Sequence, residues 1–218
     1  MSLIDLSIEE RGFAPTSIAL AVRTIGACPA ARHRPDARIL TGIGILTVTR
    51  DDRGGHRFTT DARCLGENDT VAHLLDWLEP HVASSHAVVS WDNFGAVPRR
   101  LLALADQARH PQIIATAADT AGRWRALPLG HTWHLRQARA HLMPCVCPPQ
   151  TPVDECEAAM PSVLLPNPAD TAVELVNEAI AGWRCWARLF GDFDDADHPA
   201  QAALRALDRW RADQPATR

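Results

Sequence analysis

The first third of the chain predicts three β-strands. Residues 17–24 form an apolar, partly β-branched run between Pro15 and Gly26, which is typical of a buried strand. A second apolar run covers residues 39–49, and the sequence DDRGG after it has the composition of a hairpin turn. The alternating pattern over residues 56–65 predicts the returning third strand.

The following segments alternate between helix and strand. A helix capped by Asn68 or Asp69 is expected to extend to residue 83, because its valine and leucines recur at helical spacing. Residues 87–91 predict a short buried strand, and a helix is expected over residues 98–108.

Beyond residue 110 the pattern is irregular until the last two helices. A short strand is expected at residues 112–116, and the prolines of residues 143–152 predict an irregular stretch that leads into a short helix ending before Pro161. A long helix is expected from Asp170 or Thr171 to about Phe190, and a last helix over residues 199–211.

This order of elements predicts an α/β protein with a mixed sheet. The predicted order resembles that of the ribonuclease H-like fold: three strands, with a hairpin turn between the second and third, are followed by a helix, a strand and further helices. We therefore expect a ribonuclease H-like mixed sheet flanked by helices over residues 17–193, with an N-terminal arm over residues 1–16 and a C-terminal helix within residues 194–218.

Composition narrows the possible chemistry. All 22 basic side chains are arginine and there is no tyrosine, which excludes Schiff-base lysine chemistry and a tyrosine acid or nucleophile. The net charge of -4 and a pI near 6.2 argue for local rather than extensive nucleic-acid contact. Six cysteines, with no signal peptide and no apolar run of about 18 residues, favour a reduced cytoplasmic protein without membrane contact.

The middle of the chain carries motifs of a known enzyme superfamily. The run Val89–Pro98 (VSWDNFGAVP) follows an acidic, leucine-rich helix and resembles the DEDD 3'-5' exonucleases, where a strand ends in Val-Ser/Thr-Trp-Asn-Gly before a helix-opening proline. Residues 130–142 (GHTWHLRQARAHL) and 176–190 (VNEAIAGWRCWARLF) resemble two later segments. The resemblance covers residues 17–193 and is closest to the predicted exonuclease family related to proofreading domains of B-type polymerases.

Such enzymes hold two Mg²⁺ or Mn²⁺ ions with four carboxylates, and a Tyr or His orients the attacking water. The resemblance places the family's first Asp-x-Glu pair on Ala21 and Arg23, so both acids are missing and one is replaced by a cation. A guanidinium here would repel a metal ion and would instead face a phosphate or a neighbouring carboxylate.

The other motifs have lost their acids as well. The second Asp falls on Ala96, with Asp92 where Asn is usual, and the third motif's Tyr and Asp fall on Val176 and Ile180. We therefore expect a catalytically degenerate exonuclease without a metal cofactor. The shared fold alone does not fix its function.

The former active-site cleft is the expected binding surface for single-stranded nucleic acid or a protein partner. Arg99 and Arg100 lie in the first turn of a helix, where cations oppose the helix dipole unless an anion is near. The candidate binding residues are Arg23, Trp91, Asp92, Asn93, Arg99 and Arg100.

Two further functions stay open. An active nuclease would bind Mg²⁺ or Mn²⁺ through relocated ligands from Asp92, Glu174 or Glu178. A protein–protein adaptor would use the same cleft without binding nucleic acid. Strong dependence of affinity on salt would distinguish a nucleic-acid binder from an adaptor.

Other reactive residues have simpler explanations. His131, His134, His141, Cys145 and Cys147 lack the spacing of a familiar zinc site, so we favour no zinc. Cysteine catalysis by Cys64, Cys145 or Cys156 is a minor alternative, because free cysteines are usually small buried side chains.

Two groups of tryptophans receive different interpretations. Trp183 and Trp186 share one stripe of the long helix and are expected in the core. Trp124, between Arg123 and Arg125, is interpreted as a surface cation-π cluster rather than a base-stacking platform.

Overall fold

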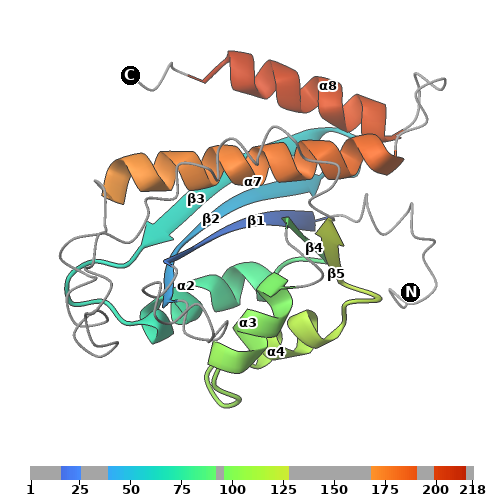
Figure 1. Cartoon of the computed structure of the whole chain (residues 1–218). Helices are drawn as coiled ribbons and strands as arrows, with labels where there is room; N and C mark the ends of the chain where they lie inside the picture. Colours follow the sequence, from blue (N-terminus) through green and yellow to red (C-terminus); the bar gives the residue numbers. More distant parts are fainter. Residues whose placement is uncertain (1–15, 26–38, 92–95, 128–167, 191–198, 215–218) are drawn as a thin grey trace.

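A five-stranded mixed sheet forms the centre of the molecule (Figure 1). The structure is a computed structural model that describes residues 16–25, 39–91, 96–127, 168–190 and 199–214. The strands are β1 (Thr16–Ile25), β2 (Ile39–Arg50), β3 (His56–Cys64), β4 (Ala87–Trp91) and β5 (Trp124–Leu127).

The strand order is β3-β2-β1-β4-β5, with β1 at the centre. The pairs β1–β2 and β2–β3 are antiparallel, whereas β1–β4 and β4–β5 are parallel. An antiparallel hairpin set extended by parallel strands is the ribonuclease H-like arrangement, so the predicted fold class is confirmed.

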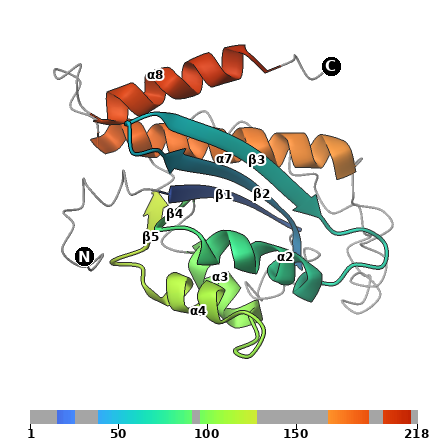
Figure 2. The same cartoon turned by 180° about the vertical axis from the view of Figure 1, so that it is seen from behind.

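Helices cover both faces of the sheet. In both views α7 and α8 lie on one face, and α2, α3 and α4 lie on the other (Figures 1 and 2). Their bounds are α2 (Val71–Ala83), α3 (Ala96–Leu104), α4 (Pro111–Ala118), α7 (Pro168–Phe190) and α8 (Pro199–Ala212).

Each face of the sheet has its own apolar core, because successive strand residues point to opposite faces. Ala19 and Ala21 of β1 pack with α7 and α8, while Ile18 and Leu20 pack with α2, α3 and α4. Trp183 and Trp186 are 1% exposed in the first core, which confirms their predicted place.

The predicted strand at residues 112–116 is wrong, because this segment forms helix α4. Pro111 suits the first turn of a helix. The carboxylate of Glu79, on α2, accepts hydrogen bonds from the backbone N–H groups of Gln112 and Ile113 at 2.7 and 3.0 Å. A tertiary contact therefore caps α4, and no local sequence signal reveals it.

The surface interpretation of Trp124 is also wrong. Trp124 opens the unpredicted strand β5, is fully buried against α2, α3 and α4, and donates from Nε1 to Ser90 Oγ at 2.7 Å. Its neighbour Arg123 donates to the backbone oxygens of Val82 and Ser85, at 3.0 and 2.7 Å. The Arg123 guanidinium thus binds backbone carbonyls at the C-terminal end of α2 and does not stack on an exposed Trp124 ring.

Helix boundaries differ from the prediction at four places, one of which is the start of α3 at Ala96 rather than residue 98. α2 is capped by Thr70, because the Asp69 carboxylate instead accepts the Gly66 N–H at 3.0 Å. α3 ends at Leu104 rather than residue 108, where Asp106 Oδ1 accepts the N–H groups of Ala108 and Arg109. α7 begins at Pro168, two residues before the expected cap.

Several expectations concern residues outside the described part of the chain. These are the N-terminal arm up to residue 15, the irregular stretch and short helix between residues 143 and 161, and the histidine–cysteine window from His131 to Cys147. Among the helices that the structure describes, none has the length and apolarity needed to cross a membrane.

Two glycines of β2 set how closely α7 can lie against the sheet. A Cβ on Gly44 would lie 2.5 Å from the backbone carbonyl carbon of Leu175, and one on Gly42 would lie 2.8 Å from Leu175 Cδ1. Only a residue without a side chain permits this contact at Gly44. The pair is thus a packing feature of β2.

We expect Gly44→Ala to destabilise the protein by about 3 kcal/mol, the upper end of the range for overpacked cores. The new methyl group would overlap the backbone of α7 at Leu175, so the helix would have to move. Gly42→Ala should cost about 1 kcal/mol, since a flexible side-chain end can shift. Gly66→Ala is the control: its Cβ would meet only Asp69 Oδ2 at 3.4 Å. Urea unfolding measures all three, and equal values for Gly44 and Gly66 would contradict the packing argument.

Candidate functional site at the end of the central strand

Several elements meet at the end of the sheet where the central strand β1 ends. β2 begins and β3 ends beside the last residues of β1, since Gly42 pairs with Arg23 on one side and Cys64 on the other. The parallel strand β4 ends earlier, because its Ser90 pairs with Leu20 of β1. The beginning of α7 packs on the same place through Leu175. We call Arg23, Cys64 and Glu174 the β1-end cluster.

An ion pair dominates the β1-end cluster. A terminal guanidinium nitrogen of Arg23 lies 2.6 Å from Glu174 Oε2, with the two side chains 19% and 61% exposed. Arg23 alternates with Ala19 and Ala21, so it points to the α7 face of the sheet. Of the two expected partners of this guanidinium, phosphate or carboxylate, the structure supplies the carboxylate.

Three of the positions that the resemblance aligns with exonuclease motifs come together beside this ion pair, whereas Ala96, aligned with the second Asp, lies at the start of α3. Ala21 of β1 and Ile180 of α7 are 3% and 4% exposed in one apolar cluster, and Val176 packs against it. None of these side chains has an oxygen or nitrogen to offer a metal ion, and the nearby cation of Arg23 opposes one. The residues present do not fit the metal pair that the resemblance implies.

Relocated ligands find no support in the described part of the chain. Glu174 is occupied by Arg23, and Glu178 is a half-buried residue of α7. Nowhere among the described residues do three or more His, Cys, Asp or Glu side chains come together as a metal-binding group. Asp92, the third alternative ligand, lies outside the described residues.

Cys64 is poorly suited to nucleophilic chemistry. Burial raises the pKa of its thiol, and the Arg23 cation offsets only part of that effect. The thiol is therefore protonated at neutral pH, and the thiolate is the reactive form. Cys145 and Cys156, the other candidates, lie outside the described residues.

The predicted binding residues do not form one pocket. Arg23 lies on the α7 face, whereas Arg99 and Arg100 belong to α3 on the opposite face, where Leu101 enters the other core. Arg99 is exposed and Arg100 is half-buried. The cations therefore belong to opposite layers of the fold.

The remaining candidates follow β4. Trp91 is the last residue of that strand, while its side chain and the residues Asp92 and Asn93 lie outside the described part. The register of β4 nevertheless places the Trp91 position beside Ala21, because Ser90 pairs with Leu20 of β1.

A second polar cluster, absent from the sequence-based candidates, joins α2 to the start of α4. His110 is 1% exposed, and its Nε2 lies 3.0 Å from Asp76 Oδ1. Its Nδ1 accepts the N–H of Asp106 at 3.0 Å, which puts the proton of the neutral ring on Nε2. Both ring nitrogens are thus engaged in holding the α3–α4 connection, and the pair is structural.

Asp76 also binds a cation. Its Oδ2 lies 2.5 Å from a guanidinium nitrogen of Arg109. Burial alone would raise the pKa of Asp76, but the His110 hydrogen bond and the Arg109 cation outweigh it and hold the pKa below its ordinary value.

The comparisons with known proteins add no relative to this picture. No protein-family model matches the chain, and no curated protein sequence matches it either.

We predict that Arg23→Met and Glu174→Gln are coupled. A double-mutant cycle measured by urea unfolding should give a coupling free energy of about 0.5–1 kcal/mol, because the two charged groups are close but partly exposed to solvent. This coupling free energy should fall in about 1 M salt. The same cycle between Arg23 and Asp170, which shares no ion pair with Arg23, should give a value near zero. Equal coupling in both cycles would contradict a specific ion pair.

We predict that Asp76→Asn lowers stability at neutral pH and flattens its loss in acid. The folded-state pKa lies below the unfolded value of about 3.9, so the unfolded state binds more protons near that pH. The stabilisation is present above that value and is lost as the pH falls through the folded-state pKa. Urea unfolding midpoints from pH 7 to 2.5 measure this pH-dependent stabilisation, and Asp52→Asn, at an exposed turn residue, is the control. If the midpoints of the wild type and of Asp76→Asn change in parallel with pH, the prediction is wrong.

Proposed function

We propose that this chain binds single-stranded nucleic acid beside the C-terminal half of β1, where β4 ends, and does not cleave it. Its ribonuclease H-like sheet has the order that the exonuclease resemblance implies. The β1-end cluster is the observation that carries the proposal, because a cation–carboxylate pair and apolar side chains stand where the resemblance calls for metal ligands.

Electrostatics favours binding without hydrolysis. Two-metal hydrolysis requires hard oxygen ligands around both cations, and the Arg23 guanidinium would repel cations at that place. The same positive charge attracts a phosphate, and Glu174 is exposed enough to release Arg23 when one arrives. The positive charge of this site therefore attracts an anion, but its residues do not provide the metal ligands that two-metal activation of water requires.

The beginning of α3 provides the phosphate contacts of this proposal. Its first turn, residues 96–99, contains Arg99 and no acidic residue, and Arg100 follows in the second turn. Backbone N–H groups at a helix start attract anions, and the Arg99 guanidinium adds a positive charge to them.

A protein–protein adaptor is the second candidate, and one observation favours it. Leu102 and Leu104 of α3 are 36% and 39% exposed, and Val173 at the start of α7 is 41% exposed. Exposed apolar residues beside arginines are common at protein interfaces. An adaptor would use the same helix without a dependence on phosphate.

The test combines a nuclease assay with a binding titration. The purified protein with Mn²⁺ should leave end-labelled single strands intact yet bind them, with log affinity falling by about 0.7 per phosphate contact for each unit of log salt. Arg99→Gln should weaken binding and reduce that slope by about 0.7, whereas Arg53→Gln, at the opposite end of the sheet, should change neither.

Three results would decide against this function. Mn²⁺-dependent degradation that disappears in Glu174→Gln or Glu178→Gln would establish the active-nuclease alternative. Strand binding unchanged by Arg99→Gln would remove α3 from the site. Absence of strand binding, together with a partner captured by the wild type and lost in Leu102→Glu, would establish the adaptor.

A further inference from the structure

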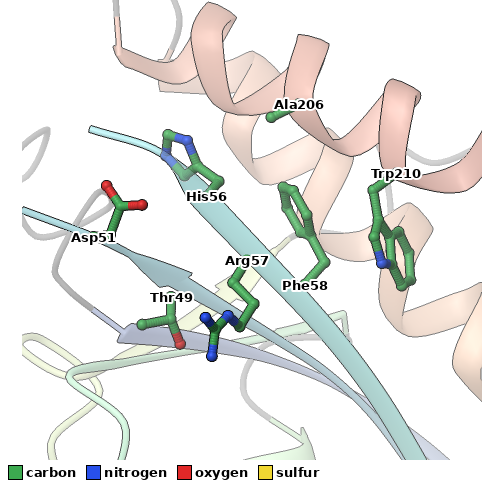
Figure 3. A pocket seen from close by; sticks show the side chains of 7 residues that line it. All are labelled: Thr49, Asp51, His56, Arg57, Phe58, Ala206 and Trp210. Carbon is green, nitrogen blue, oxygen red and sulfur yellow. The ribbon is translucent and has the colours of Figure 1, made fainter. Parts of the chain in front are cut away.

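A groove of about 530 Å³ lies at the end of the sheet opposite the β1-end cluster. It runs between the β2–β3 hairpin and helix α8 (Figure 3). Its volume is within the usual range for sites that bind small molecules, about 300–1,000 Å³. This location makes the groove independent of the site proposed above.

Aromatic rings form one part of the groove. Phe58 is 5% exposed at its floor, and its ring centroid lies 6.3 Å from that of His56 and 5.6 Å from that of Trp210. Ala206 of α8 leaves room above these rings, since its side chain is a single methyl group. The arrangement offers ring faces and edges to a flat ligand.

Polar side chains form the other part. Figure 3 shows Arg57 and Thr49 on the other side of the hairpin from Phe58, so the groove passes around the outer strand β3. Arg57 is exposed and forms no ion pair with any described residue. A ligand that fills the groove therefore meets rings at one end and a cation at the other.

The remaining titratable side chains of the groove leave Arg57 as the group that can meet an anion. Asp51 also lines the groove, but its Oδ1 already accepts the N–H groups of Arg53 and Gly55 at 2.9 and 2.7 Å. Burial and the Arg50 cation lower the pKa of His56, against a smaller opposing effect of Asp51. The His56 ring is thus neutral at pH 7, and the lining holds one cation, Arg57, and one carboxylate, Asp51. Because the turn already engages Asp51 Oδ1, the Arg57 guanidinium is the charged group best placed to meet a ligand.

We propose that this groove binds a nucleotide, with the base on the Trp210 and His56 rings and the phosphate at Arg57. Base–aromatic stacking tolerates any base, and an arginine guanidinium suits a phosphate. A free mononucleotide and one unit of a single strand share this chemistry. The proposal holds whether or not the opposite edge of the sheet binds nucleic acid.

Isothermal titration with AMP is the test, with two groove variants and one matched control. Arg57→Gln should weaken AMP binding about tenfold, as should replacing AMP by adenosine in the wild type. Ala206→Leu, which fills the groove with a side chain that suits a helix, should abolish binding. Arg53→Gln, a cation at the hairpin tip that does not line the groove, should stay within about twofold of the wild type.

A short oligothymidylate distinguishes the two sources. Tighter binding of the oligonucleotide than of thymidine monophosphate, lost in Ala206→Leu, would make the ligand a unit of a strand; equal or weaker binding would make it a free nucleotide. The proposal fails if AMP shows no saturable binding up to millimolar concentration. It also fails if Ala206→Leu binds AMP like the wild type while both remain folded by circular dichroism.

Discussion

The contact between helix α7 and strand β2 is the constraint on which the rest of this structure depends. Leu175 lies so close to Gly44 that a β-carbon there would overlap the helix backbone. This contact places α7 across the centre of the sheet, where Trp183 donates a hydrogen bond to Ser17 of β1 at 3.2 Å. The same placement brings Glu174 to the end of β1 and so creates the ion pair with Arg23.

The ion pair also sets the chemistry at the end of the central strand. The ribonuclease H-like sheet places the end of β1 beside helix α7, which crosses it. Here Ala21 and Ile180 extend the core to this place, and Arg23 supplies the opposite charge. This end of the sheet therefore carries a cation–carboxylate pair and apolar side chains, and the fold alone does not fix what it does.

Local patterns predicted the elements whose apolar residues follow a clear period. The strands up to residue 64, the strand at residues 87–91 and the long helix with Trp183 and Trp186 belong to this group. Patterns failed where a distant contact decides the structure: Glu79 caps α4, and Trp124 is buried by the partners of β5. Arginines on both sides of Trp124 suggested a surface position, yet Arg123 reaches back to α2.

The candidate site was predictable in part. The resemblance pointed to the end of β1, and Arg23 lies there, but its carboxylate partner comes from a residue 151 positions away, which no local motif reveals. The separation of Arg23 from α3 by the sheet was equally invisible, since local patterns do not show which face of the sheet a helix covers. The groove at the hairpin needed α8 folded over β3 before its rings could be recognised as one surface.

A crystal structure of the protein soaked in Mn²⁺ would show directly whether the end of β1 holds a metal ion. We expect no ion at the end of β1, with the Arg23 guanidinium still on Glu174. A manganese ion bound there by Glu174 or Glu178, with Arg23 displaced, would contradict the account.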